Sequence, residues 1–104
     1  MILEDHIAEQ KVFSLNTFGP GTRLNGVLDH VRKELVEIEE SGGQDLEEWV
    51  DAWLLIVDGM WRQGFSEDQI TSAIKAKFAK NKKRKWPDWR TQSADKAITH
   101  IEDV

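Results

Sequence analysis

Two pairs of acidic residues repeat the same three-residue spacing. Glu34 and Glu37 form the first pair, and Glu48 and Asp51 form the second. Side chains three residues apart project from one side of a helix, so two helices packed antiparallel would bring all four carboxylates together. Such like charges repel unless a cation is bound, and oxygen ligands suit Mg²⁺ or Mn²⁺ rather than zinc. This spacing predicts a divalent metal site, with solvated surface carboxylates as the alternative.

A basic segment follows this acidic region. Seven of the fourteen Lys and Arg residues lie between residues 75 and 85, whereas residues 34–58 contain nine carboxylates and neither Lys nor Arg. Lys77, Asn81 and Arg84 recur at spacings of four and three, which places them on one helix face. Arg offers a planar fork for phosphate and Lys a point charge. The segment is either a phosphate-binding face or a solvated surface.

Four further side chains have weaker signals. His30 precedes Glu34 by one turn and either contacts the substrate or is an ordinary exposed histidine. Trp86 either stacks on a base or fills a core or an interface. Asp58 is a candidate accessory ligand, and Arg23 is a candidate phosphate contact.

Helical periodicity dominates the chain, and strand signals are weak. Val27, Val31, Leu35 and Ile38 give one apolar helix face, and Asp45 and Ser66 are N-cap candidates with Glu48 and Gln69 at the box positions. We expect an all-α bundle in a single domain over residues 1–104. Its elements are three main helices over about 22–40, 46–63 and 66–81, with short terminal helices over 3–13 and 93–102.

The composition limits the classes of function. The chain has 104 residues, a net charge of −5 and no cysteine, which excludes disulfides, thiolate zinc sites and cysteine nucleophiles. The acidic balance argues against a general nucleic-acid binder. No apolar run is long enough to span a membrane, and the acidic N-terminus lacks signal-peptide features, so we expect a cytoplasmic protein. Trp49, Trp53 and Trp61 offer more aromatic surface than one small bundle needs, which favours a homo-oligomer.

At this point the residues resemble a known family. Glu34-Leu35-Val36-Glu37 and Glu48-Trp49-Val50-Asp51 are similar to the paired ExxE and ExxD motifs of MazG-like all-α nucleoside triphosphate pyrophosphohydrolases. The likeness is closest to the small dATP/dGTP branch found in phages and bacteria. It covers most of the chain and extends through segments 18–21, 29–35 and 58–59, Lys77, Asn81, Arg84, and the Trp86-Pro87-Asp88-Trp89-Arg90 segment.

The resemblance implies a MazG-like helical bundle assembled as a dimer or a dimer of dimers. It implies Mg²⁺- or Mn²⁺-dependent hydrolysis of a purine nucleoside triphosphate, dGTP, GTP or dATP, to the monophosphate and pyrophosphate. Metal ligation and catalysis would then fall to Glu34, Glu37, Glu48 and Asp51, and substrate binding to Lys77, Asn81, Arg84, Trp86 and His30. Either Glu37 or Glu34 would orient the attacking water. In related phages such an enzyme supplies dGMP to a 2-aminoadenine pathway, which would place this protein in the host cytoplasm.

A function of another class is the alternative. A non-catalytic helical module could oligomerise and bind a protein or a nucleic acid through the basic 75–85 segment. Binding would then weaken steeply with salt and would not depend on a divalent metal.

Overall fold

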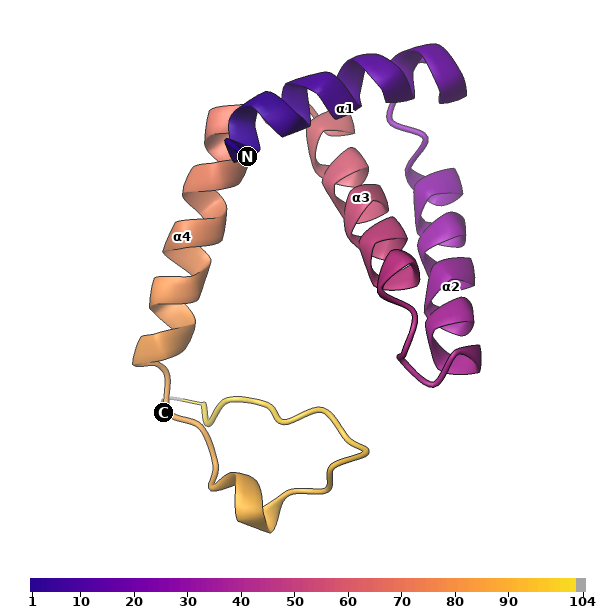
Figure 1. The fold of residues 1–104 in the computed structure, drawn as a ribbon. Helices are drawn as coiled ribbons and strands as arrows, with labels where there is room; N and C mark the ends of the chain where they lie inside the picture. Colours follow the sequence, from indigo (N-terminus) through magenta and orange to yellow (C-terminus); the bar gives the residue numbers. More distant parts are fainter. Residues whose placement is uncertain (103–104) are drawn as a thin grey trace. The chain divides into compact units, whose positions relative to one another are not determined.

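The computed structural model describes residues 1–102 and confirms the all-α prediction, because no strand occurs in that part of the chain. The chain divides into two compact units, Met1–Thr71 and Ser72–Val104, and the single domain stays a prediction. The elements are α1 (Leu3–Phe18), α2 (Leu24–Glu40), α3 (Leu46–Arg62), α4 (Glu67–Lys83) and the short 3₁₀ helix η1 (Trp89–Thr91) (Figure 1).

Helices α2 and α3 form an antiparallel pair in the first unit, and α1 lies across the end where α2 begins and α3 ends (Figure 1). A short turn joins the pair: Gly42 and Gly43 have φ of 64° and 76°, and the Gly43 N–H donates to the Ile38 carbonyl at 2.9 Å. Glycine adopts this left-handed conformation at little steric cost. The Asp45 side chain then caps α3 by accepting from the Glu47 N–H at 3.0 Å. The turn therefore brings the two acidic pairs side by side, as predicted.

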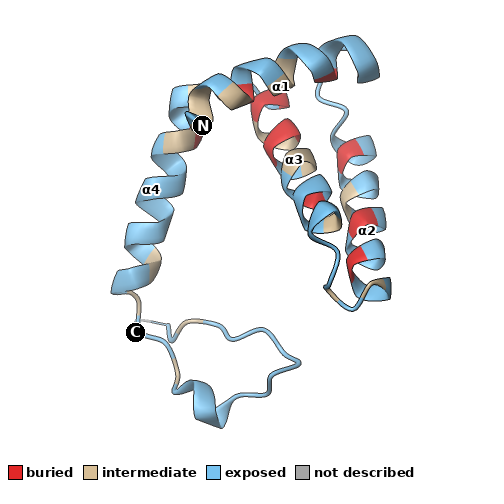
Figure 2. Ribbon diagram, viewed as in Figure 1, coloured by how far each residue is buried: buried red, intermediate tan, exposed pale blue. Residues whose placement is uncertain are grey.

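A small apolar core holds α1, α3 and the start of α4 together (Figure 2). Ile7, Val57 and Ile70 are at most 2% exposed, and Trp61 is 6% exposed. The reciprocal capping box predicted at Ser66 is present: the Gln69 N–H donates to Ser66 Oγ, and the Ser66 N–H donates to Gln69 Oε1. The first turn of α4 is thereby fixed where Ile70 enters this core.

The buried face of α2 differs from the predicted one by a single residue. Val27, Glu34 and Ile38 are buried and Val31 is half-buried, whereas Leu35 is 50% exposed. The observed face has spacings of four, three and four, and the predicted face has spacings of four, four and three. Both are helical, so periodicity alone does not choose between Glu34 and Leu35. The structure places the carboxylate inside and the leucine outside.

Both predicted terminal helices need correction. The N-terminal helix continues to Phe18 instead of ending near residue 13. The helix expected over residues 93–102 is absent: the segment forms turns and irregular chain. Ser93 Oγ accepts from the Asp95 N–H at 3.1 Å, and such local bonds compete with helix formation. A short segment rich in β-branched residues without a buried face is also a poor helix former.

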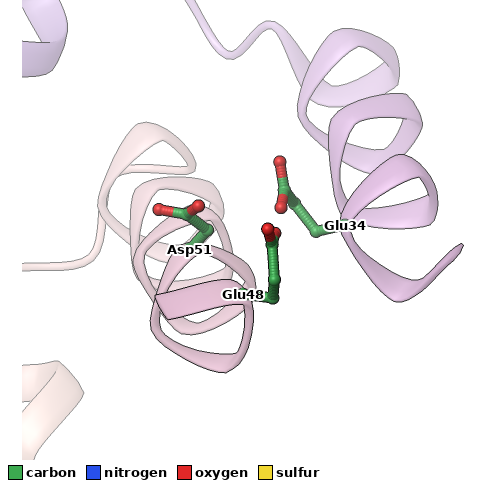
Figure 3. Close-up of side chains that lie close together, drawn as sticks. All are labelled: Glu34, Glu48 and Asp51. Carbon is green, nitrogen blue, oxygen red and sulfur yellow. The ribbon is translucent and has the colours of Figure 1, made fainter. Parts of the chain in front are cut away.

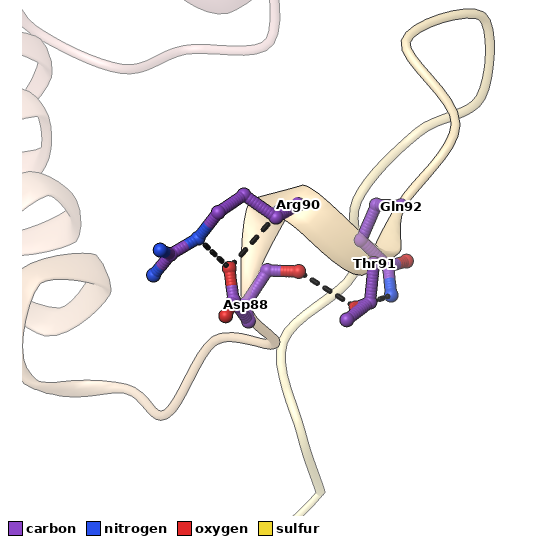
Figure 4. Close-up of polar contacts among 4 residues, drawn as sticks. All are labelled: Asp88, Arg90, Thr91 and Gln92. Atoms are coloured by element: carbon purple, nitrogen blue, oxygen red, sulfur yellow. Dashed lines mark hydrogen bonds and ion pairs between the residues drawn. The ribbon is translucent and has the colours of Figure 1, made fainter.

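In the second unit, the helix ends before the Trp-Pro segment, as predicted. The remainder of α4 runs to Lys83 and is exposed except for a half-buried Asn81. The carboxylate of Asp88 then starts η1 by accepting from both the backbone N–H and Nε of Arg90 (Figure 4). Across residues 1–102, the helices all fall short of the length and apolarity that crossing a membrane requires.

Candidate functional site

Three of the four predicted carboxylates meet in the seam between α2 and α3. Glu34 from α2 and Glu48 and Asp51 from α3 each offer an oxygen, and these oxygens lie within 4.8 Å of one another (Figure 3). Glu34 is buried, Glu48 is half-buried and Asp51 is exposed. The cluster therefore opens to solvent on the α3 side.

The electrostatics of the cluster are those of carboxylates held together against repulsion. Burial, followed by a hydrogen bond with Glu37 and its charge, raises the pKa of Glu34. The hydrogen bond with Glu37, followed by burial and the charge of Glu37, raises the pKa of Glu48 to about 7. Both shifts mean that the folded protein without a cation resists ionisation of these two groups.

The donor set fits a hard divalent cation. Oε2 of Glu34 and Oε2 of Glu48 are buried and have no hydrogen-bond partner among the described residues. Buried carboxylate oxygens are normally paired with donors or bound to metal ions, because an unpaired buried charge is costly. Clustered carboxylate oxygens are the ligands that Mg²⁺ and Mn²⁺ prefer.

Glu37 lies beside the cluster rather than in its centre. It raises the pKa of Glu34 and of Glu48 but is not one of the three residues whose ligand oxygens converge. Its role as a ligand, or as the residue that orients a water, stays a prediction. The Glu48 side chain belongs to the carboxylate cluster and does not complete the capping box predicted with Asp45. The Asp45 side chain caps α3 by itself.

A cavity of about 260 Å³ adjoins the carboxylate cluster between α1, α2 and α3. Its wall combines aromatic and aliphatic side chains with the carboxylates of Glu34 and Asp51, which belong to both features. His30 also lines it, and His30 Nε2 lies 3.4 Å from Glu34 Oε1. The remaining lining residues are Gln10, Phe13, Ser14, Phe18, Leu54, Leu55 and Asp58.

Asp58 is engaged in a buried network and is not among the three converging carboxylates. Its carboxylate accepts from Gln10 Nε2 at 2.7 Å, Ser14 Oγ at 2.5 Å and Trp61 Nε1 at 3.0 Å. Arg62, also buried, donates to Ser14 Oγ at 2.8 Å. These bonds hold α1 against α3 at the cavity.

Sequence reasoning missed Gln10, Ser14 and Arg62. One signal was available for the first two: Leu3, Ile7, Gln10 and Ser14 follow the spacing of four, three and four that marks a buried helix face. Polar residues on such a face need buried partners. Those partners lie 44 to 48 residues away, beyond any local pattern.

The basic and aromatic residues predicted to bind substrate lie in the second unit. Arg84 Nη1 donates to Asn81 Oδ1 at 3.1 Å, and Trp86 Nε1 donates to the Asn81 carbonyl at 2.8 Å. The positive charge of Arg84, followed by burial and the charge of Lys80, lowers the pKa of Lys77. These cations therefore lie close enough to repel one another. Arg23 lies over the Phe18 ring, with its guanidinium carbon 5.9 Å from the ring centroid.

Comparison with known proteins gives one match. The sequence model of the dATP/dGTP pyrophosphohydrolase family matches residues 4–104, which is nearly the whole chain. No curated protein and no solved structure matches it significantly.

Proposed function

The chain belongs to the dATP/dGTP pyrophosphohydrolase family and is thus a nucleoside triphosphate pyrophosphohydrolase; we propose that it hydrolyses a purine deoxynucleoside triphosphate, dATP or dGTP, to the monophosphate and pyrophosphate. We assign metal binding to Glu34, Glu37, Glu48 and Asp51, and Mg²⁺ or Mn²⁺ as the metal. The observation that carries this assignment is the convergence of three carboxylates whose buried oxygens include two without a partner.

The reaction is a substitution at the α-phosphorus. Water loses a proton to solvent and adds its oxygen to that phosphorus, the bond to the oxygen bridging the α- and β-phosphorus atoms breaks, and pyrophosphate leaves with the bridging oxygen. A divalent ion in this site supplies Lewis-acid chemistry, because it neutralises phosphate charge and favours deprotonation of water. A carboxylate oxygen of Glu37 or Glu34 accepts a hydrogen bond from the attacking water and so orients it.

The cavity supports a place for the nucleoside. Glu34 and Asp51 are common to the cavity wall and the carboxylate cluster, so a molecule bound in the cavity has one end at the cluster. Phe13, Phe18 and the two leucines give this cavity a mainly apolar wall suited to a base and a deoxyribose. We assign His30, which lines the same cavity, to substrate contact.

We further assign Lys77, Asn81, Arg84 and Trp86 to substrate binding, the first three through phosphate. Their clustering and the lowered pKa of Lys77 support an anion-binding face. Replacing Arg84 by Met should raise KM for the triphosphate, and an unchanged KM would remove Arg84 from the substrate site.

A second copy of the chain is part of the proposal. Leu24, Leu28 and Leu35 form an exposed apolar stripe on α2, each at least 40% exposed, and Trp49 and Trp53 expose apolar surface on α3. Apolar surface of this extent marks an interaction site. A homodimer, or a dimer of dimers, would cover it.

Product analysis tests the proposal. The full chain would be incubated with Mg²⁺ or Mn²⁺ and, separately, dATP, dGTP, dCTP, dTTP and GTP, and the products separated. We expect dAMP or dGMP with pyrophosphate in equal amounts. Preference for dGTP would support a role in supplying dGMP to a phage 2-aminoadenine pathway. A diphosphate product, or no turnover by folded protein, would contradict the proposed reaction, and the latter would favour a binding module that acts through residues 75–85.

A further inference from the structure

A single buried guanidinium ties α1, the following turn and α3 together. Arg62 lies at the end of α3 and is 6% exposed. Its Nη1 donates to the carbonyls of Gly19 and Gly21, both at 2.9 Å. Its Nη2 donates to the Ser14 carbonyl at 3.3 Å and to Ser14 Oγ at 2.8 Å. The planar fork thus reaches the last turns of α1 and the connection to α2 at once.

The charge of Arg62 is balanced through a hydroxyl group. Ser14 Oγ accepts from Arg62 and donates to Asp58, so it bridges a buried cation and a buried anion. The guanidinium also lies over the Trp61 ring, 4.6 Å from its centroid. A buried charge with several directed partners fixes the groups that surround it, because losing one partner leaves a buried polar atom unpaired.

The turn that Arg62 holds is conformationally unusual. Gly19 and Gly21 have φ of 87° and 90°, and Arg23 is left-handed with φ of 44°. Glycine adopts such φ values at little steric cost, so contacts from outside the turn are needed to hold it in one conformation. The two hydrogen bonds from Arg62 to the carbonyls of Gly19 and Gly21 are contacts of that kind.

This turn directly follows a residue that lines the cavity next to the carboxylates. Phe18, which immediately precedes the turn, lines the cavity, and so do Ser14 and Asp58 of the network. The carboxylates come from α2 and α3, which pair without any of the bonds that Arg62 makes to residues 14–21. The wall of the cavity at Phe18 and the carboxylate cluster are therefore held by separate contacts.

We propose that Arg62 is a positioning residue for the substrate. Through Ser14 and the Gly19–Gly21 turn it fixes Phe18 as the wall of the cavity that receives the nucleoside, without contributing to metal binding. The inference rests on the proposed function, because it takes a nucleoside as the occupant of the cavity.

The test compares Arg62→Met and Arg62→Lys with Arg32→Met, which removes an exposed arginine from α2. For Arg62→Met we expect KM for dATP and dGTP to rise about tenfold or more, with a smaller change in kcat. The Kd for Mn²⁺ without nucleotide should stay within about twofold of the wild-type value. Arg62→Lys should recover part of the loss, since an ammonium can still donate to the carbonyls but lacks the fork. Ser14→Ala, which only removes the bridging hydroxyl, should raise KM in the same direction.

A double-substitution cycle then asks whether Arg62 acts through Phe18. Phe18→Ala alone should raise KM, and adding Arg62→Met to it should raise KM little further, because the wall is already lost. Additive effects would overturn the inference. So would an unchanged KM in Arg62→Met, or loss of Mn²⁺ binding in both Arg62→Met and Ser14→Ala, since Arg62 would then support the fold as a whole. Absence of hydrolysis by the wild-type chain would instead contradict the proposed function, and that result is obtained before any variant is measured.

Discussion

Glu34 occupies a position in α2 that an aliphatic residue would fill in an ordinary helix pair. It is 7% exposed, and its Oε2 has no hydrogen-bond partner among the described residues. A site of this kind costs stability until a cation binds, because desolvation and nearby carboxylates both oppose ionisation. We therefore expect the free energy of unfolding of the metal-free protein to depend on pH.

The sign of this dependence follows from the raised pKa values. Below about pH 4.5, the ordinary pKa of Glu, both folded and unfolded states hold their protons. Between there and pH 7 the unfolded chain loses protons first, so the free energy of unfolding falls as pH rises through the pKa of about 7 for Glu48. Above that pH the loss is complete.

Urea unfolding with a chelator at pH 5 and pH 8 measures this loss. We expect wild-type stability to decrease relative to that of Glu48→Gln, which removes the titrating group. We also expect Mn²⁺ to raise the melting temperature more at pH 8 than at pH 5, because protons compete with the metal. A wild-type protein that gains stability over Glu48→Gln across this window would contradict the prediction.

At the scale of elements, local signals predicted the acidic helix pair well. The Gly-Gly turn, the cap at Asp45 and the apolar periodicity of α2 and α3 are encoded within a few residues of each junction. They sufficed to predict that the two acidic pairs face each other. They did not reveal that Glu34 rather than Leu35 is buried, since each fits a helical stripe and only the position of the partner helix decides.

The cap at Asp45 offers a test at this scale. Its side chain accepts from the Glu47 N–H, so Asp45→Ala should lower the free energy of unfolding by about 1 kcal/mol. Gln44→Ala, at the exposed neighbouring position, should change it by less than about 0.5 kcal/mol. Urea denaturation followed by circular dichroism measures both. Equal effects of the two substitutions would show that the cap does not stabilise α3.

Elsewhere local signals were insufficient. The 93–102 segment has apolar residues at helical spacing but forms no helix, because spacing alone does not supply a surface to pack against. The network of Ser14, Asp58 and Arg62 was missed for a different reason. Helical spacing marks Ser14 as part of a buried face, but its partners lie 44 to 48 residues away, where no local pattern identifies them.

At the scale of the whole molecule, the described chain buries few large side chains. Of the five tryptophans only Trp61 is buried, and Trp53 remains 39% exposed on α3. A chain of this length with such exposed apolar stripes would gain stability by association. Oligomerisation would therefore bury the apolar side chains that α2 and α3 expose.

Light scattering coupled to size-exclusion chromatography tests the assembly. We expect wild-type protein to elute as a dimer or larger, and Leu28→Glu or Trp53→Glu to shift it toward the monomer, because a charge in an apolar interface is costly. Gln63→Glu adds the same charge at an exposed polar position and should leave the mass unchanged. A monomeric wild-type protein would contradict the proposed homo-oligomer.

Pyrophosphate release from dATP and dGTP, with Mg²⁺ or Mn²⁺, should be measured for the wild-type chain and its carboxylate variants. We expect monophosphate and pyrophosphate from the wild type. We also expect a loss of about 100-fold or more in Glu34→Gln, Glu48→Gln and Asp51→Asn, each still folded. Glu39→Gln, which removes an exposed carboxylate from the same α2 helix, should retain wild-type activity. Full activity in all three cluster variants would contradict the claim that these carboxylates form the active site.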